Sequence, residues 1–344
     1  MGFAQQGTSP AQGTPPAERP AALVPGTDRR IRLDVVVTDH SGNPVPGLQQ
    51  QDFTILDNKQ PRTITSFNMV DGASNPADSP QQSLVMLDAI NTPYNGIAFQ
   101  RLQLEKFLRQ GGGELPLPMS LSVLTDTSES QPVATRDGNT LADSLNSNQS
   151  GLRAIDRAQG FYGDAERLQL SLSALDRLAA NEATQPGRKL VVWLGPGWPL
   201  LSGPEVELGP KDQEWLFRNI VSLSTALRVA RVTLYNVNQP GMDEPLDRMF
   251  YYQNFLKGVG SATKVQNGDL ALQVLAVQSG GRVFNTSNDI AKSIATCLGD
   301  ARVFYTLSFD APVANYPNEY HSLQVKISKP GLTARTRAGY YAQP

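Results

Sequence analysis

The residue best placed to do chemistry is Asp88. It ends the apolar run 84–87 and is followed by Ala89-Ile90-Asn91-Thr92. Open α/β sheets bind their ligands beyond the carboxyl ends of such strands. A carboxylate with hydroxyl and amide oxygens nearby suits a hard cation such as Mg²⁺. The alternative is an aspartate that only ends the strand or caps the next helix, and both interpretations remain open.

A second set of candidates is aromatic and lies in two loop segments. The segment GPGWPLL at 195–201 follows another apolar strand, and the long connection 238–266 contains several aromatic side chains. Long connections are usually functional or disordered, and aromatic residues are enriched in protein-binding surfaces. The alternative for the connection is a helix packed on the body, since one helical face is partly matched by Leu246, Met249, Phe250 and Phe255. The predicted partner-contacting residues are Asn91, Trp198, Tyr251 and Tyr252.

The residue inventory excludes several classes of function. The chain has 30 Lys+Arg against 32 Asp+Glu, a net charge of −2, and no basic stripe to neutralise nucleic-acid phosphates. Two histidines, His40 and His321, leave little room for a histidine metal site or a Ser-His-Asp triad. Neither a G-x-G-x-x-G nor a G-x-S-x-G motif is present, and Cys297 is expected to be a buried apolar residue. We therefore expect a protein that is not an enzyme and binds no nucleic acid.

The first residues bear on the cellular compartment. Residues 1–29 are rich in Ala, Gln, Gly and Pro and lack apolar periodicity, so we expect a flexible leader. The start Met1-Gly2-Phe3-Ala4 is compatible with the end of a signal peptide and equally with an arbitrary start. The expected location is outside the cytoplasm: secreted, periplasmic or at the cell surface. No run of about 18 apolar residues occurs, so no membrane-spanning helix is predicted.

The elements that must position these candidates fall into three parts. Short strands with tight turns are predicted in 30–70, including one strand over 62–70. From 83 to 300, apolar strands alternate with helices of 10 to 20 residues, which predicts a mainly parallel sheet with helices on both faces. Strands return in 301–342, the last over 332–338. The predicted fold is therefore α/β, with a doubly wound Rossmann-like sheet and a small β-sandwich module built from both chain ends.

Several stretches carry a resemblance to a known family. The string LVMLDAINT at 84–92 resembles the first strand and metal loop of von Willebrand factor type A domains. The strand PGRKLVVWL at 186–194 and the helix-strand segment AVQSGGRVF at 276–284 occur in the expected order. The β segments at 35–53 and 305–341 resemble the ends of the VWFA-related domain proteins that are frequent in acidobacteria. The resemblance covers most of residues 30–342.

This resemblance implies a partner-binding domain with a metal ion-dependent adhesion site, and the sequence departs from that site. Asp88 matches the first aspartate of the Asp-x-Ser-x-Ser loop, and Thr92 matches its second serine. Ile90 stands in place of the first serine and cannot bind a metal. The third loop, Gly195-Pro196-Gly197, has no aspartate, and Asp164 is the substitute considered for the second loop. The candidate metal residues are thus Asp88, Thr92 and Asp164; we expect no cofactor, with Mg²⁺ as the one alternative.

The function expected from these observations is non-enzymatic binding of another protein, of the adhesion type, by an exported module with a degenerate metal site. The alternative is a structural or assembly component of the cell envelope that has no metal-dependent ligand. A near-neutral chain has little long-range electrostatic attraction for a partner. Recognition is therefore expected to rest on aromatic and apolar loop contacts.

Overall fold

A computed structural model of the chain describes residues 29–72, 81–125, 133–147, 160–200, 208–239 and 249–344. The predicted leader, apart from Arg29, lies outside the described residues, as do Leu201 and Leu246. Among the helices that the structure describes, none is both long and apolar enough to cross a lipid bilayer.

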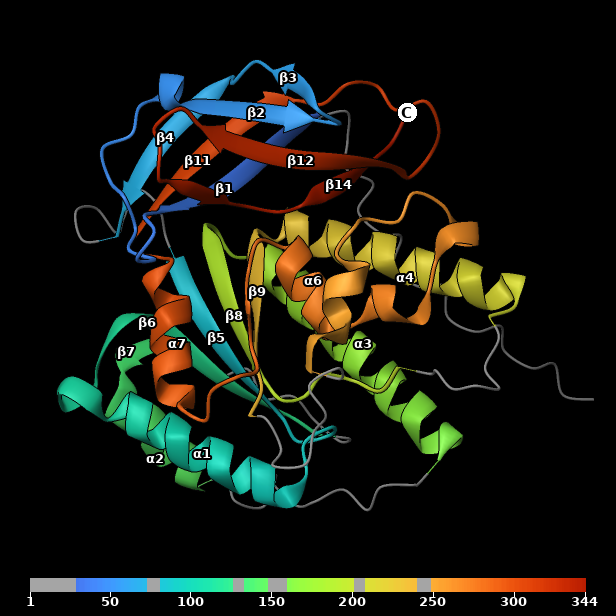
Figure 1. Ribbon diagram of the computed structural model, residues 1–344. Helices are drawn as coiled ribbons and strands as arrows, with labels where there is room; N and C mark the ends of the chain where they lie inside the picture. The colour runs from blue at the N-terminus through green and yellow to red at the C-terminus, as the bar shows by residue number, and fades with distance from the viewer. Residues whose placement is uncertain (1–28, 73–80, 126–132, 148–159, 201–207, 240–248) are drawn as a thin grey trace, which may run out of the picture.

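A six-stranded sheet forms the centre of the molecule (Figure 1). Its order is β10-β9-β8-β5-β6-β7, and every neighbouring pair is parallel except β6 and β7. The strands are β5 (Gln81–Asp88), β6 (Glu114–Leu124), β7 (Thr135–Asp137), β8 (Arg188–Leu194), β9 (Val232–Val237) and β10 (Val283–Phe284). The chain builds outward in one direction from β5 to β6 and β7, and in the other from β8 to β10. The strand order therefore reverses between β5 and β8, where open sheets bind their ligands.

Helices cover both faces of this sheet, as the apolar strands predict. Successive residues of β5 alternate between the two sides: Leu84 and Met86 join one hydrophobic cluster, and Val85 and Leu87 join the other. On the first side lie α3 (Phe161–Ala183), α4 (Pro210–Val229) and α6 (Leu272–Gln278). On the second side lie α1 (Tyr94–Leu108), α2 (Gly138–Ser147) and α7 (Ile290–Gly299). The expected mixed α/β fold with a doubly wound sheet is observed.

Short 3₁₀ helices connect these elements. They are η1 (Gln50–Asp52), η2 (Gln110–Gly113), η4 (Tyr251–Phe255), η5 (Ala262–Lys264) and η6 (Asn267–Leu270). The last three lie in or just after the long predicted connection, so its described part forms short turns rather than one continuous helix.

Two further four-stranded sheets contain strands from both chain ends (Figure 1). One has the order β13-β1-β11-β4, with β13 (Thr333–Arg335), β1 (Arg30–Thr38), β11 (Val303–Asp310) and β4 (Ser66–Asp71). The other has the order β14-β12-β2-β3, with β14 (Gly339–Ala342), β12 (Glu319–Ile327), β2 (Phe53–Asp57) and β3 (Gln60–Arg62). Apolar residues from both sheets form one cluster.

Two predicted strands need correction, because the chain passes from one sheet to the other within the first and directly after the second. The segment predicted as one strand over 62–70 forms the end of β3 and most of β4, which lie in different sheets. Likewise, 332–338 contributes only β13, and the chain then enters β14 of the other sheet. A chain that turns a corner between packed sheets must break its ladder there.

Candidate functional site

The site that the fold points to lies where β5 and β8 end. Asp88 is the last residue of β5, and Leu87 pairs with Leu194, the last residue of β8. Asp88 therefore lies at the carboxyl edge of the sheet, at the point of strand reversal. The first turns of α1 and α3 lie at the same edge, in the lower part of Figure 1.

The Asp88 carboxylate is surrounded by hydrogen-bond donors of the protein. Its Oδ1 accepts from the backbone N–H groups of Ile90 at 3.2 Å and Asn91 at 2.9 Å. The side-chain amide of Asn91 donates to both carboxylate oxygens, at 3.1 and 2.9 Å. The indole N–H of Trp193, on β8, donates to Oδ2 at 3.0 Å. The carboxylate therefore ties its own loop to the neighbouring strand.

Asn91 extends this network to the helix layer. Its side-chain nitrogen also donates to Ser171 Oγ at 2.9 Å, and that hydroxyl donates to the carbonyl oxygen of Arg167 within α3. Asn91 is 8% exposed, and its Oδ1 has no hydrogen-bond partner within the part of the chain that the structure describes. In this position Asn91 mainly donates hydrogen bonds to Asp88 and presents little surface to a partner.

Burial controls the protonation of Asp88. The side chain is fully buried, and this desolvation raises the pKa of its carboxyl above the ordinary value of 3.8. Hydrogen bonds from Asn91, Trp193 and Ile90 act in the opposite direction by stabilising the charged form. Burial has the larger effect, so the carboxylate depends on its donors to remain inside the protein.

Thr92 lies one turn from Asp88, and its backbone N–H donates to the Asp88 carbonyl oxygen at 3.2 Å. A Cβ atom built on Gly195 would lie 2.8 Å from Asp88 Cβ, 3.1 Å from Thr92 Oγ1 and 3.4 Å from Asp88 Oδ2. Gly195 also has a φ of 152° in the left-handed region. Only glycine fits this position, because a side chain would displace the aspartate or the threonine.

The atoms at this site do not fit a metal ion. Oδ1 faces three donor contacts and Oδ2 faces two, and the hydrogens of those donors carry partial positive charge. Mg²⁺ in turn requires about six oxygen ligands at roughly 2.1 Å. Within the described ranges, no three His, Cys, Asp or Glu side chains gather where they could hold a metal. The donor set argues against the Mg²⁺ site considered from the sequence.

Asp164 lies apart from Asp88. It is in the first turn of α3 and forms an ion pair with Arg167 on the same helix. Ser171, which reaches the Asp88 network through Asn91, lies seven residues further along, about 10 Å at the α-helical rise. No hydrogen bond among the described residues joins Asp164 to Asp88. The structure thus does not bring the third candidate ligand to the site.

Trp198, which the sequence predicts to contact a partner, is a core side chain in the structure. It is 5% exposed, and its indole N–H donates to the carbonyl oxygen of Leu270 at 2.9 Å. Its ring packs edge-on against Trp193 with a centroid distance of 5.9 Å. Trp198 belongs to the hydrophobic cluster on the side of the sheet that faces α4 and α6.

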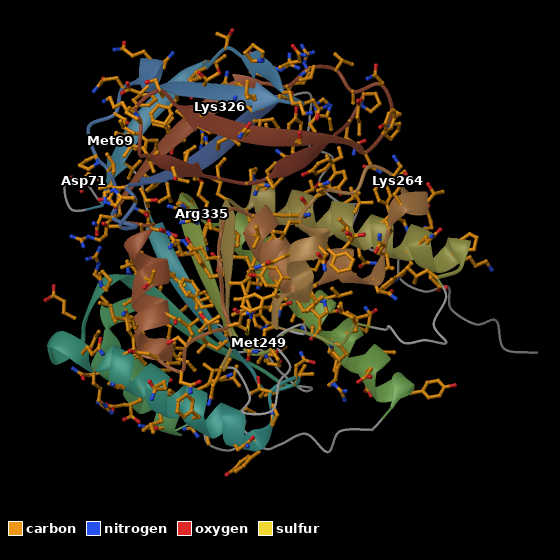
Figure 2. The ribbon with its side chains drawn as sticks, in the orientation of Figure 1. Met69, Asp71, Met249, Lys264, Lys326 and Arg335 are labelled. Atoms are coloured by element: carbon orange, nitrogen blue, oxygen red, sulfur yellow. The ribbon has the colours of Figure 1, made fainter. Side chains whose placement is uncertain are left out.

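The predicted tyrosines differ from each other. Tyr252 is 8% exposed and packs against Ala271 and Val274, so the structure does not present it to a partner. Tyr251 is half-buried, and its hydroxyl donates to Gln273 Oε1 at 3.2 Å. Gln273 donates in turn to the carbonyl oxygen of Pro196 at 2.8 Å. The described part of the long connection therefore covers the loop that follows β8; Met249, at its start, is labelled in Figure 2.

Other aromatic side chains at the carboxyl edge are exposed; the sequence interpretation missed two of them, Tyr94 and Tyr162, and included the third, Phe250, only among the aromatic residues of the long connection. Tyr94, the first residue of α1, is 67% exposed, and Tyr162, in the first turn of α3, is 87% exposed. Phe250 is 36% exposed and follows Met249, whose carbonyl oxygen accepts a hydrogen bond from Asn285 just after β10. An aromatic residue at the first turn after a loop, outside the apolar helical face, is the signal that would have found the two tyrosines.

Comparison with protein-family models and with curated proteins found no match. Among solved structures, the human COPII-coat protein Sec24c is similar at 8% identity and a TM-score of 0.36, over 88% of this chain and 48% of that one. The VWA domain of SpRpn10 has 10% identity and a TM-score of 0.28, over 62% and 93%. The pilus adhesin SpaC from Lactobacillus rhamnosus GG has 8% identity and a TM-score of 0.37, over 90% and 50%. The chain spans about half the length of Sec24c and SpaC, and because every TM-score is below 0.5 we take the fold from the strand order alone.

Proposed function

We propose that this chain is a non-enzymatic protein-binding module with a von Willebrand factor A-like fold, and that it binds its partner without a metal ion. The observation that carries the proposal is the Asp88 carboxylate, whose two oxygens are taken up by Asn91, Ile90 and Trp193. It lies at the strand-reversal point where a metal-dependent relative would hold its cation. Hydrogen-bond donors of the protein occupy the place of that cation. The loop after β5 is therefore held in position by these donors, and no open metal position remains.

The surface we propose for binding is the aromatic rim of this edge, defined by Tyr94, Tyr162 and Phe250. Tyrosine supplies a large contact area at low entropic cost and is enriched at protein interfaces. Tyr94 and Tyr162 lie in the first turns of α1 and α3, two helices that pack on the central sheet, so little reorganisation is needed on binding. The edge that the Asp88 network holds in place therefore supports this exposed rim.

The finer parts of the proposal follow the sequence resemblance. We propose that the module is of the acidobacterial VWFA-related type, that its two outer sheets form one β-sandwich module, and that it is exported and works in adhesion. The alternative is a structural role in the cell envelope without a discrete ligand. The capture experiment described next distinguishes this role from partner binding.

The experiment is affinity capture from an envelope extract of the source organism, carried out in EDTA. The immobilised proteins are the wild type, the double variant Tyr94→Ala/Tyr162→Ala, and Tyr316→Ala as a matched control. Tyr316 is 50% exposed and lies between β11 and β12, in the part of the chain that forms the outer sheets. We expect the wild type and the control to retain the same partner in EDTA and the double variant to lose it. Capture that requires added Mg²⁺, or that survives in the double variant, would contradict the proposal.

A further inference from the structure

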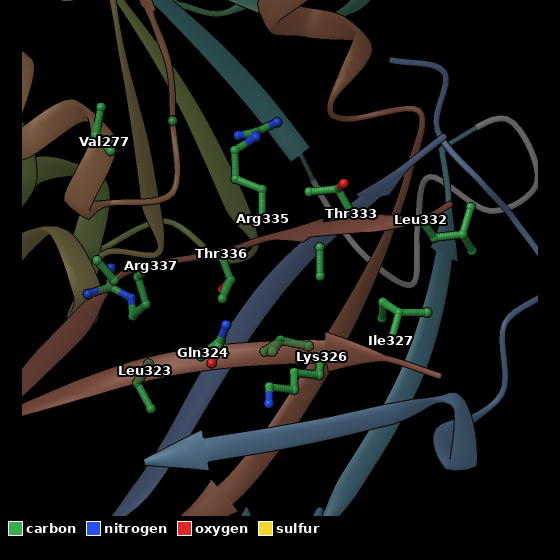
Figure 3. A pocket seen from close by; sticks show the side chains of 14 residues that line it. Val277, Leu323, Gln324, Lys326, Ile327, Leu332, Thr333, Arg335, Thr336 and Arg337 are labelled. Atoms are coloured by element: carbon green, nitrogen blue, oxygen red, sulfur yellow. The ribbon is translucent and has the colours of Figure 1, made fainter. Parts of the chain in front are cut away.

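A groove of about 540 Å³ lies on the outer sheets, away from the Asp88 edge (Figure 3). One wall is β12, with Gln324 and Lys326, and the other is the segment that contains β13, with Thr333 and Arg335. These two strands belong to different sheets, and each is at an edge over this stretch.

The groove exists because the chain separates from β12 after a few residues of pairing. β14 pairs with β12 only over Glu319–Ser322. The N–H of Leu323 donates to the carbonyl oxygen of Ala338 at 2.8 Å, but the N–H of Ala338 donates to Gln278 instead of returning the bond. The segment before Ala338 then joins β1 through β13. Residues 323–327 of β12 thus have a strand on one side only, which is β2.

The backbone groups on the open side of β12 follow from its alternation. Leu323 directs its N–H toward Ala338, on the open side, and Ser328 directs its N–H toward Asp52, on the β2 side. Successive residues of a strand alternate in this direction. The N–H groups of Val325 and Ile327, and the carbonyl groups of Leu323 and Val325, therefore face the groove.

The charged side chains among the residues that line the groove are all positive. Its lining includes Lys326, Arg335 and Arg337 and no carboxylate. Arg335 is paired with Asp300, whereas no ion pair or hydrogen bond is recorded for Arg337 within the described residues. Arg337 is 8% exposed; burial, followed by the nearby Arg228, lowers its pKa to about 9, so it remains charged at neutral pH. Arg337 also lines a small cavity against α4 and α6, so the exposed Lys326 is the cation that a segment in the groove would meet.

We propose that the groove binds an acidic segment of a partner protein as an added β-strand on the open edge of β12. The open backbone groups supply the pairing, and the exposed Lys326 supplies the preference for Asp or Glu side chains. The chain's own residues 1–28 fit this less well, since they contain Glu18 and Asp28 but also Arg19. The competing interpretation is that Lys326 only protects an edge strand from unwanted pairing.

The test uses three labelled peptides with the full-length protein. They are acetyl-TVEVDVT-amide, its basic counterpart acetyl-TVKVKVT-amide, and the acidic peptide N-methylated on alternate residues along one edge. Fluorescence anisotropy gives the affinities, and hydrogen exchange follows the amides of Val325 and Ile327. We expect the acidic peptide to bind at least tenfold more tightly than the basic one, to slow exchange at both amides, and to lose binding on N-methylation.

Two protein variants complete the test. Lys326→Glu is expected to weaken binding of the acidic peptide at least tenfold. Lys292→Glu, at an exposed position on α7, is expected to leave this affinity unchanged. Equal binding of the acidic and basic peptides, binding that survives N-methylation, or no binding of the acidic peptide would each overturn the proposal. So would full protection of Val325 and Ile327 before peptide is added, because the edge would then be covered by the chain itself or by a second copy.

Discussion

The Asp88 carboxylate holds three pieces of the chain in place. The N–H groups of Ile90 and Asn91 fix its own loop, the indole of Trp193 fixes β8, and the link from Asn91 to Ser171 reaches α3. Each donor is buried and would lose a partner if the carboxylate were removed. A residue that resembles a metal ligand in the sequence therefore acts as a hydrogen-bond acceptor in the structure.

The variant Asp88→Ala measures the strength of this network. Removing the carboxylate leaves the side chains of Asn91 and Trp193 buried without their acceptor, which we expect to destabilise the protein by about 3 kcal/mol. Urea unfolding checks the value. The control is Asp143→Ala, whose side chain is 72% exposed and pairs with Arg109, and a loss below about 1 kcal/mol is expected there. Equal losses in the two variants would contradict a structural role for Asp88.

The raised pKa of Asp88 gives a pH dependence with a definite sign. A carboxyl whose folded pKa exceeds its unfolded value contributes stability that is complete below the unfolded value, here 3.8, and is lost as the pH rises through the folded value. The unfolding free energy of the wild type, relative to Asp88→Asn, should therefore fall as the pH rises from 4.

The control for this pH experiment is Asp137→Asn. The hydrogen bond from the Thr140 hydroxyl has the largest effect on Asp137 and lowers the pKa of its carboxyl. This carboxyl therefore contributes stability above its unfolded pKa and loses that contribution as the pH falls. Urea unfolding between pH 3 and pH 7 measures both effects. As the pH rises, the unfolding free energy of the wild type should fall relative to Asp88→Asn and rise relative to Asp137→Asn. A relative stability of Asp88→Asn that is independent of pH would show that burial does not govern the Asp88 carboxyl.

Sequence reasoning at the residue scale found the centre of the site and missed its surroundings. Asp88 and Thr92 are predictable, because both follow one apolar strand and the next turn brings them together. Trp193 was not assigned, although an indole inside an apolar strand needs a buried acceptor, and that need points to Asp88. An aromatic residue just beyond the carboxyl end of a strand predicts a surface contact at Trp198, but the core cluster that buries it contains segments distant in the sequence.

At the scale of elements, alternating apolar strands and helices were enough to predict the doubly wound sheet. The alternation fixes which residues face each helix layer, as Val85 and Met86 on opposite faces illustrate. The breaks at 63–65 and 336–338 could not be predicted, since the residues there remain compatible with a strand. Whether such a segment changes sheets depends on which distant edge is open to it.

The end of α6 supplies a prediction at this scale. Gly280, with a φ of 95°, and Gly281 end the helix in a Schellman turn, with N–H bonds to Val277 and Ala276. A Cβ atom on Gly281 would lie 1.8 Å from the carbonyl oxygen of Leu234 on β9. Gly281→Ala is therefore expected to cost about 3 kcal/mol through displaced backbone.

The matched control for Gly281→Ala is Gly299→Ala. Gly299 ends α7, and nothing lies within 4 Å of a Cβ atom built on it. An alanine there should leave the stability unchanged or raise it by about 0.5 kcal/mol. Urea unfolding gives the change in unfolding free energy for each variant. Similar changes in the two variants would mean that α6 and β9 do not pack as closely as described.

At the scale of the whole molecule, a buried polar cluster joins the outer sheets to the central sheet. The Asp300 carboxylate, which follows α7, accepts from the Tyr235 hydroxyl at 2.7 Å and from Arg335 on β13. Arg188 donates to the Asp300 carbonyl oxygen at 2.8 Å and lies over the Phe304 ring at 4.6 Å. This cluster was not predictable, because its members come from four separate segments.

The variant Asp300→Asn tests this connection. It leaves the half-buried Arg335 and the buried Tyr235 hydroxyl without their carboxylate, which we expect to cost about 3 kcal/mol. Asp310→Asn, at an exposed position on β11, should change the stability by less than about 0.5 kcal/mol. Thermal unfolding by calorimetry checks both, and a wild-type melting temperature in Asp300→Asn would show that the sheets are held together without this cluster.

The most direct test of the central claim, that protein donors replace a metal at Asp88, is calorimetric titration of the wild type with Mg²⁺, Mn²⁺ and Ca²⁺. Asp88→Asn is titrated beside it under the same conditions. The account predicts only the heat of dilution for all three ions in both proteins. A one-to-one binding isotherm in the wild type that disappears in Asp88→Asn would contradict it.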